Sequence, residues 1–206
     1  GICNAMLDDE NINFIEDEEI KKIRKGVKFE ILSQHNKYEF DQICLCNSFE
    51  IGRFLDLPGL KKKRGQTTAV KNNKTLNNLK LPICAKGYIS PTKSEITILG
   101  STYNDKKDEE VLLEDHIDNI EKARIISEVD MKILGGRVGF RATTSDRLPL
   151  VGQVGDFYVH TGHGSRGSTS SPICSHFISD LICNDLPLLD LPVANALKPE
   201  RFKDLN

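Results

Sequence analysis

The sequence has 206 residues and a formal net charge of −2, with 38% hydrophobic and 28% charged residues. This composition is typical of a globular protein with a hydrophobic core, in one large domain or two small ones. The balanced charge excludes an overall basic field that would attract nucleic acid or an anionic membrane. No apolar run approaches the roughly 20 residues that span a bilayer, so we expect no membrane partner.

The six cysteines are scattered and show no CxxC spacing. The sequence therefore predicts no metal site, no redox dithiol and no disulfide framework, which favours a reducing cytoplasm. Cys44 and Cys46 alternate with Ile43 and Leu45. We expect both to pack as small apolar side chains.

The first 60 residues predict mainly strands. Residues 14–25 are charged with isolated isoleucines and fit a helix or a strand equally well. Residues 28–31 and 38–45 read as strands, joined through the polar residues 33–37 as a hairpin. Residues 47–59 are expected to form a loop.

A basic cluster follows at Lys61, Lys62, Lys63 and Arg64. One interpretation is a solvated charge run where the chain crosses between domains. The other is a surface that contacts the phosphates of a nucleic acid, with Lys62, Lys63 and Arg64 as its candidate residues. Adjacent charges without interleaved aromatic residues do not decide between the two.

The middle of the chain predicts a sheet followed by a helix. Short apolar segments at 83–84, 88–89 and 96–99 are separated by Gly and Pro turns, as in consecutive strands. Residues 109–126 then carry apolar positions three and four apart, which predicts the longest helix. Further strands are expected at 137–142 and 157–161, after Gly135 and Gly136. A last helix at 172–183 and an irregular tail with one short helix follow.

A glycine-rich turn joins the strand at 157–161 to the last helix. Gly162, Gly164 and Gly167 match G-x-G-x-x-G and enclose Ser165 and Arg166. The exposed N–H groups of such a helix start favour an anionic or electron-rich ligand. A complete dinucleotide fingerprint also needs a second strand ending in an acidic residue about 20 positions on. Residues 184–192 do not read as that strand, so the turn predicts a ligand site of open type, or a turn that serves packing alone.

Two polar residues precede this turn. Arg141 ends a G-x-R motif beside a strand end, where an arginine can hold a carboxylate through two hydrogen bonds. Asp146 begins D-x-x-P-x-x-G, and either fixes its own loop or pairs with Arg147.

Taken together, these motifs resemble the C-terminal region of the glycine oxidase and D-amino-acid oxidase superfamily. Within it, the chain resembles the oxidase half of the bacterial bifunctional enzymes that modify the wobble uridine of tRNA. The resemblance extends over about residues 38–202. Its motifs are R-G-Q at 64–66, G-Y-I-S-P at 87–91, G-S-T-Y at 100–103, D-R-L-P at 146–149, G-S-R-G at 164–167, S-P at 171–172 and A-L-K-P-E-R-F at 196–202.

The resemblance implies an α/β (α+β) fold with an incomplete FAD-binding, Rossmann-like domain and a substrate domain built on a mainly antiparallel sheet. Residues 1–60 and 138–206 would form the FAD-binding part, and residues 61–137 the substrate domain. The family's first G-x-G-x-x-G, which holds the ADP portion of FAD, has no match here. We therefore expect this chain alone to bind FAD weakly or not at all, and to be inactive without its own upstream FAD-binding segment.

The implied activity is removal of the carboxymethyl group from carboxymethylaminomethyl-uridine in tRNA, with FAD as oxidant and glyoxylate as the released fragment. A methyltransferase domain that uses S-adenosylmethionine, with no counterpart in this chain, would act next. The resemblance places Arg141 on the substrate carboxylate and Tyr88 beside it, although Tyr88 also fits a core aromatic residue. Gly162, Gly164, Ser165, Arg166, Gly167 and Asp146 would bind the cofactor.

Two other functions remain open from the sequence. An amino-acid or sarcosine oxidase of the same superfamily would act on a small molecule instead of tRNA. A non-catalytic module that binds RNA or a partner protein would need no flavin.

Overall fold

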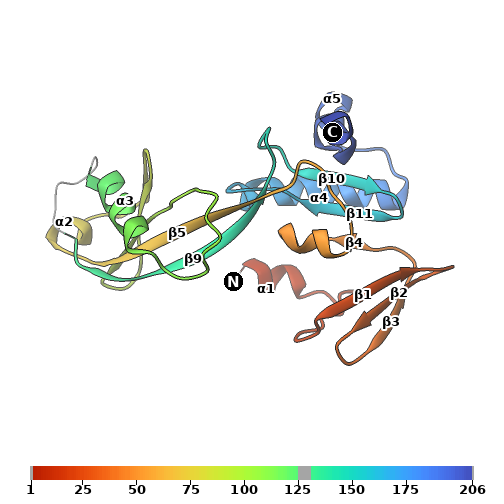
Figure 1. The fold of residues 1–206 in the computed structure, drawn as a ribbon, viewed down its shortest axis with the longest axis horizontal. Coiled ribbons are helices and arrows are strands. Elements are labelled where there is room, and N and C mark those ends of the chain that lie inside the picture. The colour runs from red at the N-terminus through yellow and green to blue at the C-terminus, as the bar shows by residue number, and fades with distance from the viewer. Residues whose placement is uncertain (1, 125–130, 206) are drawn as a thin grey trace.

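The computed structural model describes residues 2–124 and 131–205. Figure 1 shows an elongated molecule in which two long strands, β5 (Lys61–Lys71) and β9 (Ile133–Thr143), run between two lobes. One lobe holds α2 (Lys74–Asn77) and α3 (Leu113–Arg124), and the other holds α4 (Gly167–Cys183) and α5 (Leu191–Leu197). Strands that belong to one sheet thus connect the two lobes.

The larger lobe contains a three-stranded sheet in the order β10-β11-β4. Strands β10 (Leu150–Val154) and β11 (Phe157–Thr161) are antiparallel, whereas β4 (Cys44–Leu45) pairs with β11 in parallel. The parallel pair joins a segment near the start of the chain to one near its end. Helix α4 covers one face of this sheet through a buried cluster of Val151, Tyr158, Cys174, Phe177, Ile178, Ala194 and Leu197.

An antiparallel sheet of β1 (Ile20–Lys25), β2 (Phe29–Ser33) and β3 (Lys37–Phe40) packs on the same lobe. Its fully buried Phe29 joins a second core cluster with Ile43, Leu45, Ile51, Leu57, Leu150, Val159 and Phe202. The cluster also draws on η1 (Ser48–Arg53) and η2 (Pro199–Leu205), while α1 (Ile2–Leu7) begins the chain. The hairpin predicted around residues 33–37 is confirmed.

The third sheet has the order β6-β7-β8-β5-β9 and is antiparallel throughout. Its shorter strands are β6 (Ile83–Cys84), β7 (Tyr88–Pro91) and β8 (Ile96–Gly100), as the sequence predicts. Strand β5 pairs with β9 from Lys61↔Thr143 to Val70↔Ile133. Helix α3 packs on this sheet over a core of Val70, Leu76, Ile89, Leu99 and Ala123.

Several predicted boundaries are wrong, each for a local reason. The helix predicted at 109–126 begins at Leu113, because the carbonyl oxygens of Asp108 and Glu110 bind the Arg64 side chain in an extended loop. Its predicted end, at residues 125–126, lies outside the described residues. Helix α4 begins at Gly167 instead of residue 172, since the N–H of Ser170 already donates to the carbonyl of Arg166.

Strand β9 also departs from the prediction. It runs without a break through Gly135 and Gly136, and the predicted domain boundary at 137/138 falls inside it. The strand predicted at 38–45 is two strands, β3 and β4, which belong to different sheets. Cys44 and Cys46 are exposed and not packed in the core, because Ile43 and Leu45 take the inward positions of the alternating strand.

Within the described part of the chain, none of the helices has both the length and the apolar character needed to cross a bilayer.

Candidate active site

The glycine-rich turn is built from backbone that only glycine adopts easily. Gly162 has φ +77° and Gly164 has φ +57°, in the left-handed region where other residues are strained. The N–H of Gly164 donates to the carbonyl of Ala142 at 2.8 Å, which ties the turn to the end of β9. At Gly167 an added Cβ would make only ordinary contact with His163 at 3.7 Å. Gly162 and Gly164 therefore shape the turn, and Gly167 does not.

Helix α4 follows the turn without a side-chain cap. The N-cap residue is Arg166, whose side chain makes no capping hydrogen bond. The N–H groups of a first helical turn have no partner within the helix, and the helix dipole adds a partial positive charge there. The turn thus offers backbone donors to an electron-rich group.

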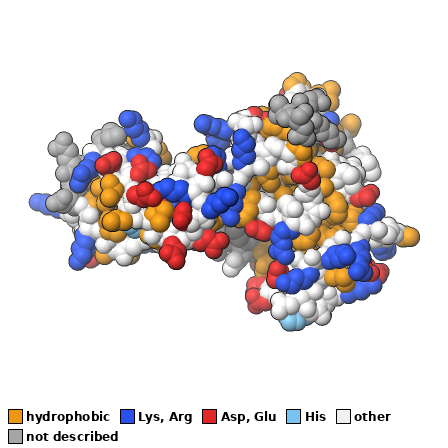
Figure 2. Space-filling view, in the orientation of Figure 1, with side chains coloured by type: hydrophobic (Ala, Val, Ile, Leu, Met, Phe, Trp, Pro, Cys, Tyr) orange, Lys and Arg blue, Asp and Glu red, His pale blue; other side chains and the backbone are white. Residues whose placement is uncertain are grey.

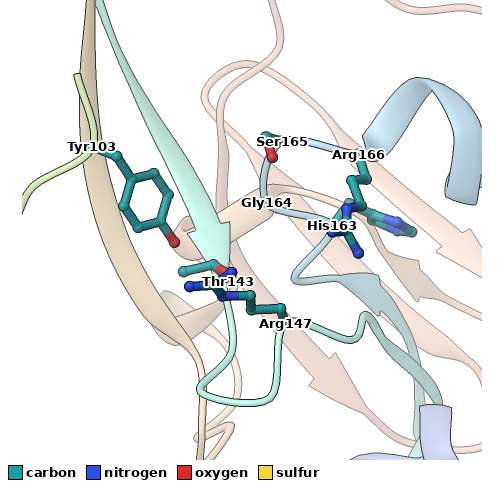
Figure 3. Close-up of a pocket in the computed structure, with 7 residues that line it drawn as sticks. All are labelled: Tyr103, Thr143, Arg147, His163, Gly164, Ser165 and Arg166. Carbon is teal, nitrogen blue, oxygen red and sulfur yellow. The ribbon is translucent and has the colours of Figure 1, made fainter. Parts of the chain in front are cut away.

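A cavity of about 230 Å³ lies between this turn and the five-stranded sheet. It is lined by Tyr103, Thr143, Arg147, His163, Gly164, Ser165 and Arg166. In Figure 3, Tyr103 lies across the cavity from the turn, and Thr143 and Arg147 lie between them. The structure thus brings Gly164, Ser165 and Arg166 to one cavity. Sequence analysis missed Tyr103, Thr143 and Arg147, which come from separate segments.

Asp146 does not line that cavity. Its carboxylate accepts hydrogen bonds from the Thr144 hydroxyl at 2.8 Å, the Leu148 N–H at 2.9 Å and the Arg201 guanidinium at 2.7 Å. Partial burial opposes ionisation, but these hydrogen bonds lower the pKa of Asp146 to about 2. Its oxygens thus fix the loop and join it to η2, and cofactor binding by Asp146 stays a prediction.

Arg141 has one unpartnered guanidinium nitrogen in a confined space. Its Nη2 donates to the Ser101 hydroxyl at 2.9 Å, whereas its buried Nη1 has no hydrogen-bond partner among the described residues. Gly65 makes room for this group, since an added Cβ there would lie 2.0 Å from Nη1. Gly65 and Arg141 line a second cavity of about 220 Å³. An unpartnered, desolvated guanidinium nitrogen is a strong donor for a carboxylate.

Tyr88 lies on the same face of the sheet. It pairs with Gly100 across β7 and β8, and a Cβ added at Gly100 would lie 2.9 Å from the Tyr88 hydroxyl and 3.3 Å from Cγ2 of Thr67. Thr67 and Gly65 are two residues apart on β5, so they share a face. Tyr88 and Arg141 therefore lie on one face of the sheet, and Tyr88 is half-buried and lies outside the fully buried core.

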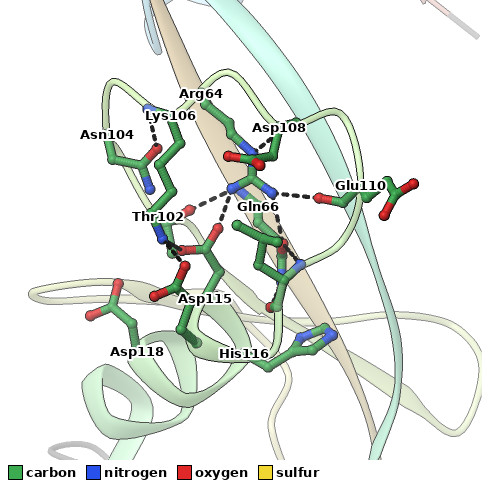
Figure 4. Close-up of polar contacts among 12 residues, drawn as sticks. Arg64, Gln66, Thr102, Asn104, Lys106, Asp108, Glu110, Asp115, His116 and Asp118 are labelled. Atoms are coloured by element: carbon green, nitrogen blue, oxygen red, sulfur yellow. Dashed lines mark hydrogen bonds and ion pairs between the residues drawn. The ribbon is translucent and has the colours of Figure 1, made fainter.

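Arg64 is not a surface residue. It is fully buried, and its guanidinium donates to the carbonyls of Asp108 and Glu110 (both 2.7 Å), to Gln66 Oε1 at 3.1 Å and to the buried carboxylate of Asp115 (Figure 4). The prediction that Arg64 contacts tRNA is wrong in this structure, because every face of its guanidinium is occupied by protein.

The neighbouring lysines have partners of their own. The Lys62 ammonium lies 4.3 Å from the Phe49 ring centre and 3.9 Å from that of Phe140. Lys63 pairs with the exposed carboxylate of Asp105. Figure 2 shows basic and acidic side chains interspersed on the visible face. The tRNA contacts of Lys62 and Lys63 stay predictions.

Behind the turn, His163 lies against a second histidine. The rings of His160 and His163 are 4.6 Å apart at their centres. Burial, with a smaller contribution from His160, lowers the pKa of His163 to about 4, so the ring is neutral near pH 7. Sequence analysis did not single out either histidine.

The comparisons with known proteins agree on one family and one fold. The model of the family described as FAD dependent oxidoreductase matches residues 4–181. The tRNA 5-methylaminomethyl-2-thiouridine biosynthesis bifunctional protein MnmC of Pseudomonas syringae pv. syringae (strain B728a) is 28% identical over 98% of this chain and 37% of that protein. The protein of the same name from Ectopseudomonas mendocina (strain ymp) is 30% identical over 78% of this chain and 31% of that protein. The chain therefore spans about a third of the length of these relatives.

Solved structures show the same fold at lower identity. Glycine oxidase from Geobacillus kaustophilus superposes with a TM-score of 0.77 at 19% identity, over 92% of this chain and 54% of that one. L-proline dehydrogenase from P. horikoshii superposes with a TM-score of 0.76 at 17% identity, over 94% of this chain and 56% of that one. The predicted fold class is thus confirmed.

Proposed function

Because this chain belongs to the FAD dependent oxidoreductase family, we propose that it forms part of an oxidase that acts on carboxymethylaminomethyl-uridine at the wobble position of tRNA. The oxidase removes the carboxymethyl group and leaves aminomethyl-uridine. The names of the relatives that match most of this chain support this choice of substrate, since they describe biosynthesis of a methylaminomethyl-uridine in tRNA.

The observation that carries the proposal is the position of Arg141 relative to the glycine-rich turn. Arg141 and Thr143 are two residues apart on β9, so their side chains leave the same face of the strand. Thr143 lines the turn cavity, and a Cβ added at Gly164 would lie 3.3 Å from its hydroxyl. One strand face therefore places a carboxylate-binding donor next to the candidate cofactor turn.

Arg141 fits the substrate that we propose. The modified uridine carries a glycine-like group, a secondary amine beside a carboxylate. That carboxylate would accept from the unpartnered Nη1 of Arg141, while the Ser101 hydroxyl holds the other nitrogen in place. Tyr88, on the same sheet face, would form the wall of the site next to the amine.

The turn fits the flavin end of FAD. Gly162 and Gly164 let the backbone approach a planar ring closely, and the uncapped start of α4 supplies N–H donors. Arg147 and Arg166 add positive charge to the cavity wall. The cavity is smaller than the roughly 300–1,000 Å³ of usual ligand pockets, so it would hold only part of the cofactor. When bound, FAD would supply the hydride acceptor for the carbon beside the amine.

The remaining partners follow from the same proposal. Residues upstream of the matched region would hold the ADP portion of FAD, and a methyltransferase domain that uses S-adenosylmethionine would methylate the product amine. On this proposal the protein works in the cytoplasm, with tRNA contacts that include Lys62 and Lys63.

The test compares Arg141→Ala with Arg24→Ala in the protein that carries this chain. Arg24 is a partly exposed arginine of β1 that pairs with Glu30, away from both cavities, so its variant controls for loss of an arginine. The substrate is tRNA bearing carboxymethylaminomethyl-uridine, read by mass spectrometry of its nucleosides and by glyoxylate release. We expect kcat/KM to fall about 10- to 100-fold in Arg141→Ala, because a hydrogen bond to a charged group contributes about 1.5–3 kcal/mol.

Equal turnover by both variants would contradict the role of Arg141. Turnover of free glycine or sarcosine with no change in the tRNA would instead assign the site to a small-molecule oxidase.

A further inference from the structure

Three possible metal ligands meet behind the glycine-rich turn. They are His160 on β11, His163 in the turn and Cys174 on α4, and one ligand atom from each lies within 4.8 Å of the other two. Cys174 is almost fully buried, and both histidines are partly buried. These residues are far from CxxC spacing, which is why the sequence predicted no metal site here.

The hydrogen bonds around His163 fix which ring nitrogen carries the proton. The Ser170 hydroxyl lies 2.8 Å from Nδ1 of His163 and donates its own proton to the carbonyl of Arg166 at 2.9 Å. Since a hydroxyl has a single proton, Ser170 must accept from the N–H at Nδ1. Nε2 of His163 therefore carries the lone pair, and it is buried with no partner among the residues that the structure describes.

His160 also has an unpartnered ring nitrogen. Its Nε2 is buried and has no hydrogen-bond partner in the described part of the chain. Two buried imidazole nitrogens of this cluster thus lack a partner. Buried polar atoms in this condition are uncommon and need an explanation.

We propose that His160, His163 and Cys174 form a zinc-binding site. Zn²⁺ prefers sulfur and nitrogen ligands, with Zn–N about 2.0–2.1 Å and Zn–S about 2.3 Å, whereas Mg²⁺ and Ca²⁺ prefer oxygen. Because ligand atoms around one Zn²⁺ lie closer together than 4.8 Å, the three side chains would rotate toward the ion on binding. Binding releases the proton of the Cys174 thiol to solvent as the Zn–S bond forms, and the fourth position is left to water.

The role of this ion would be structural. It would connect the end of β11, the turn and α4 next to the candidate flavin cavity, which His163 also lines. Ser170 would act as a positioning residue that holds His163 in the zinc-binding tautomer, as outer hydrogen-bond partners of zinc ligands do.

The test measures Zn²⁺ binding to the reduced, metal-free chain by competition with a chromophoric chelator. Co²⁺ replaces Zn²⁺ in a second titration, because thiolate-bound Co²⁺ shows a charge-transfer absorption. We expect one ion per chain, a thiolate-to-Co²⁺ band, and loss of both in His160→Gln and Cys174→Ser. Ser170→Ala should weaken Zn²⁺ binding about 10- to 100-fold.

Matched controls lie on the same helix. Cys183→Ser and Ser168→Ala remove an exposed cysteine and an exposed serine of α4, and both should bind Zn²⁺ like the parent chain. Because Cys174 is a core residue, circular dichroism checks that its variant folds, and the partly exposed His160 supplies an independent variant.

The main rival is the Cys44 and Cys46 pair, whose sulfur atoms are 3.6 Å apart. Binding that survives in Cys174→Ser but is lost in the double variant Cys44→Ser, Cys46→Ser would overturn the proposal and assign the ion to that pair. Absence of stoichiometric Zn²⁺ binding in the folded parent chain would overturn it as well.

Discussion

The glycine-rich turn and the five-stranded sheet form their candidate sites in different ways. The turn relies on backbone: two glycines with positive φ, an uncapped helix start and a short chain segment. The sheet relies on side chains brought together from distant positions, as when Gly65 leaves space for Arg141 or Asp115 neutralises Arg64. A backbone site is specified locally and tolerates changes at neighbouring side chains. A side-chain site fails when any of its distant partners changes.

The largest expected effect on stability is at the buried ion pair of the sheet. Arg64→Ala leaves the buried Asp115 with only its longer contact to Lys106, at 3.5 Å, and frees the carbonyls of Asp108 and Glu110. We expect the free energy of unfolding to fall by about 3–5 kcal/mol, measured by urea denaturation. The control is Lys62→Ala, which removes an exposed lysine two residues before Arg64 on β5. It should change the free energy of unfolding by less than about 1 kcal/mol. Equal losses would show that burial of Arg64 does not matter.

The next effect tests the space beside Arg141. Gly65→Ala places a Cβ 2.0 Å from Nη1 of Arg141 and 2.9 Å from the Thr102 carbonyl, so the guanidinium must move. We expect the oxidation of the tRNA substrate to lose about 10- to 100-fold in kcat/KM, as in Arg141→Ala. Gly52→Ala has open space around its Cβ and serves as control. An unchanged rate in Gly65→Ala would show that the space at Gly65 is not needed to position Arg141.

A smaller effect on stability is expected within the turn, where Gly164 has a positive φ and Gly167 begins a helix. Gly164→Ala forces a left-handed alanine at φ +57° and should cost about 1–2 kcal/mol of stability. Gly167→Ala meets only ordinary contact in a helix and should be neutral or slightly stabilising. Thermal unfolding of the two variants decides the matter, and a larger loss at Gly167 would be the contrary result.

The smallest effect concerns pH and Asp146. The pKa of this carboxyl is about 2 in the folded protein, below its ordinary value of 3.8, so its stabilisation is present above pH 4 and is lost as the pH falls toward 2. Because the side chain is 35% exposed, we expect only about 1 kcal/mol from it. Asp146→Asn should lose that amount at pH 7 and show less destabilisation than the parent between pH 4 and 2. A parallel pH dependence in both proteins would exclude this contribution.

The same contrast explains which features the sequence predicts. The turn is contiguous, so its glycines and the strand before it are visible in the order of residues. The short strands β7 and β8 are likewise visible in the sequence, as short apolar segments separated by Gly and Pro turns. Such signals are carried by neighbours in the chain.

The partners of Arg64 and Arg141 are invisible in the same sequence. Arg64 lies 51 positions from Asp115, and no local pattern connects them. The sequence analysis grouped Arg64 with Lys63 because the two are adjacent. Successive residues of a strand point to opposite faces, so Arg64 is buried on one face of the sheet and Lys63 lies on the other. Recognising residues 61–71 as one strand would have separated the two.

The central claim is that Arg141 recognises the carboxylate of the modified uridine. It is tested most directly by turnover of two tRNAs that differ only there, one with carboxymethylaminomethyl-uridine and one with methylaminomethyl-uridine. We expect the parent protein to prefer the carboxylate substrate by about 10- to 100-fold in kcat/KM. The preference should disappear in Arg141→Ala, and a preference that persists in this variant would contradict the account.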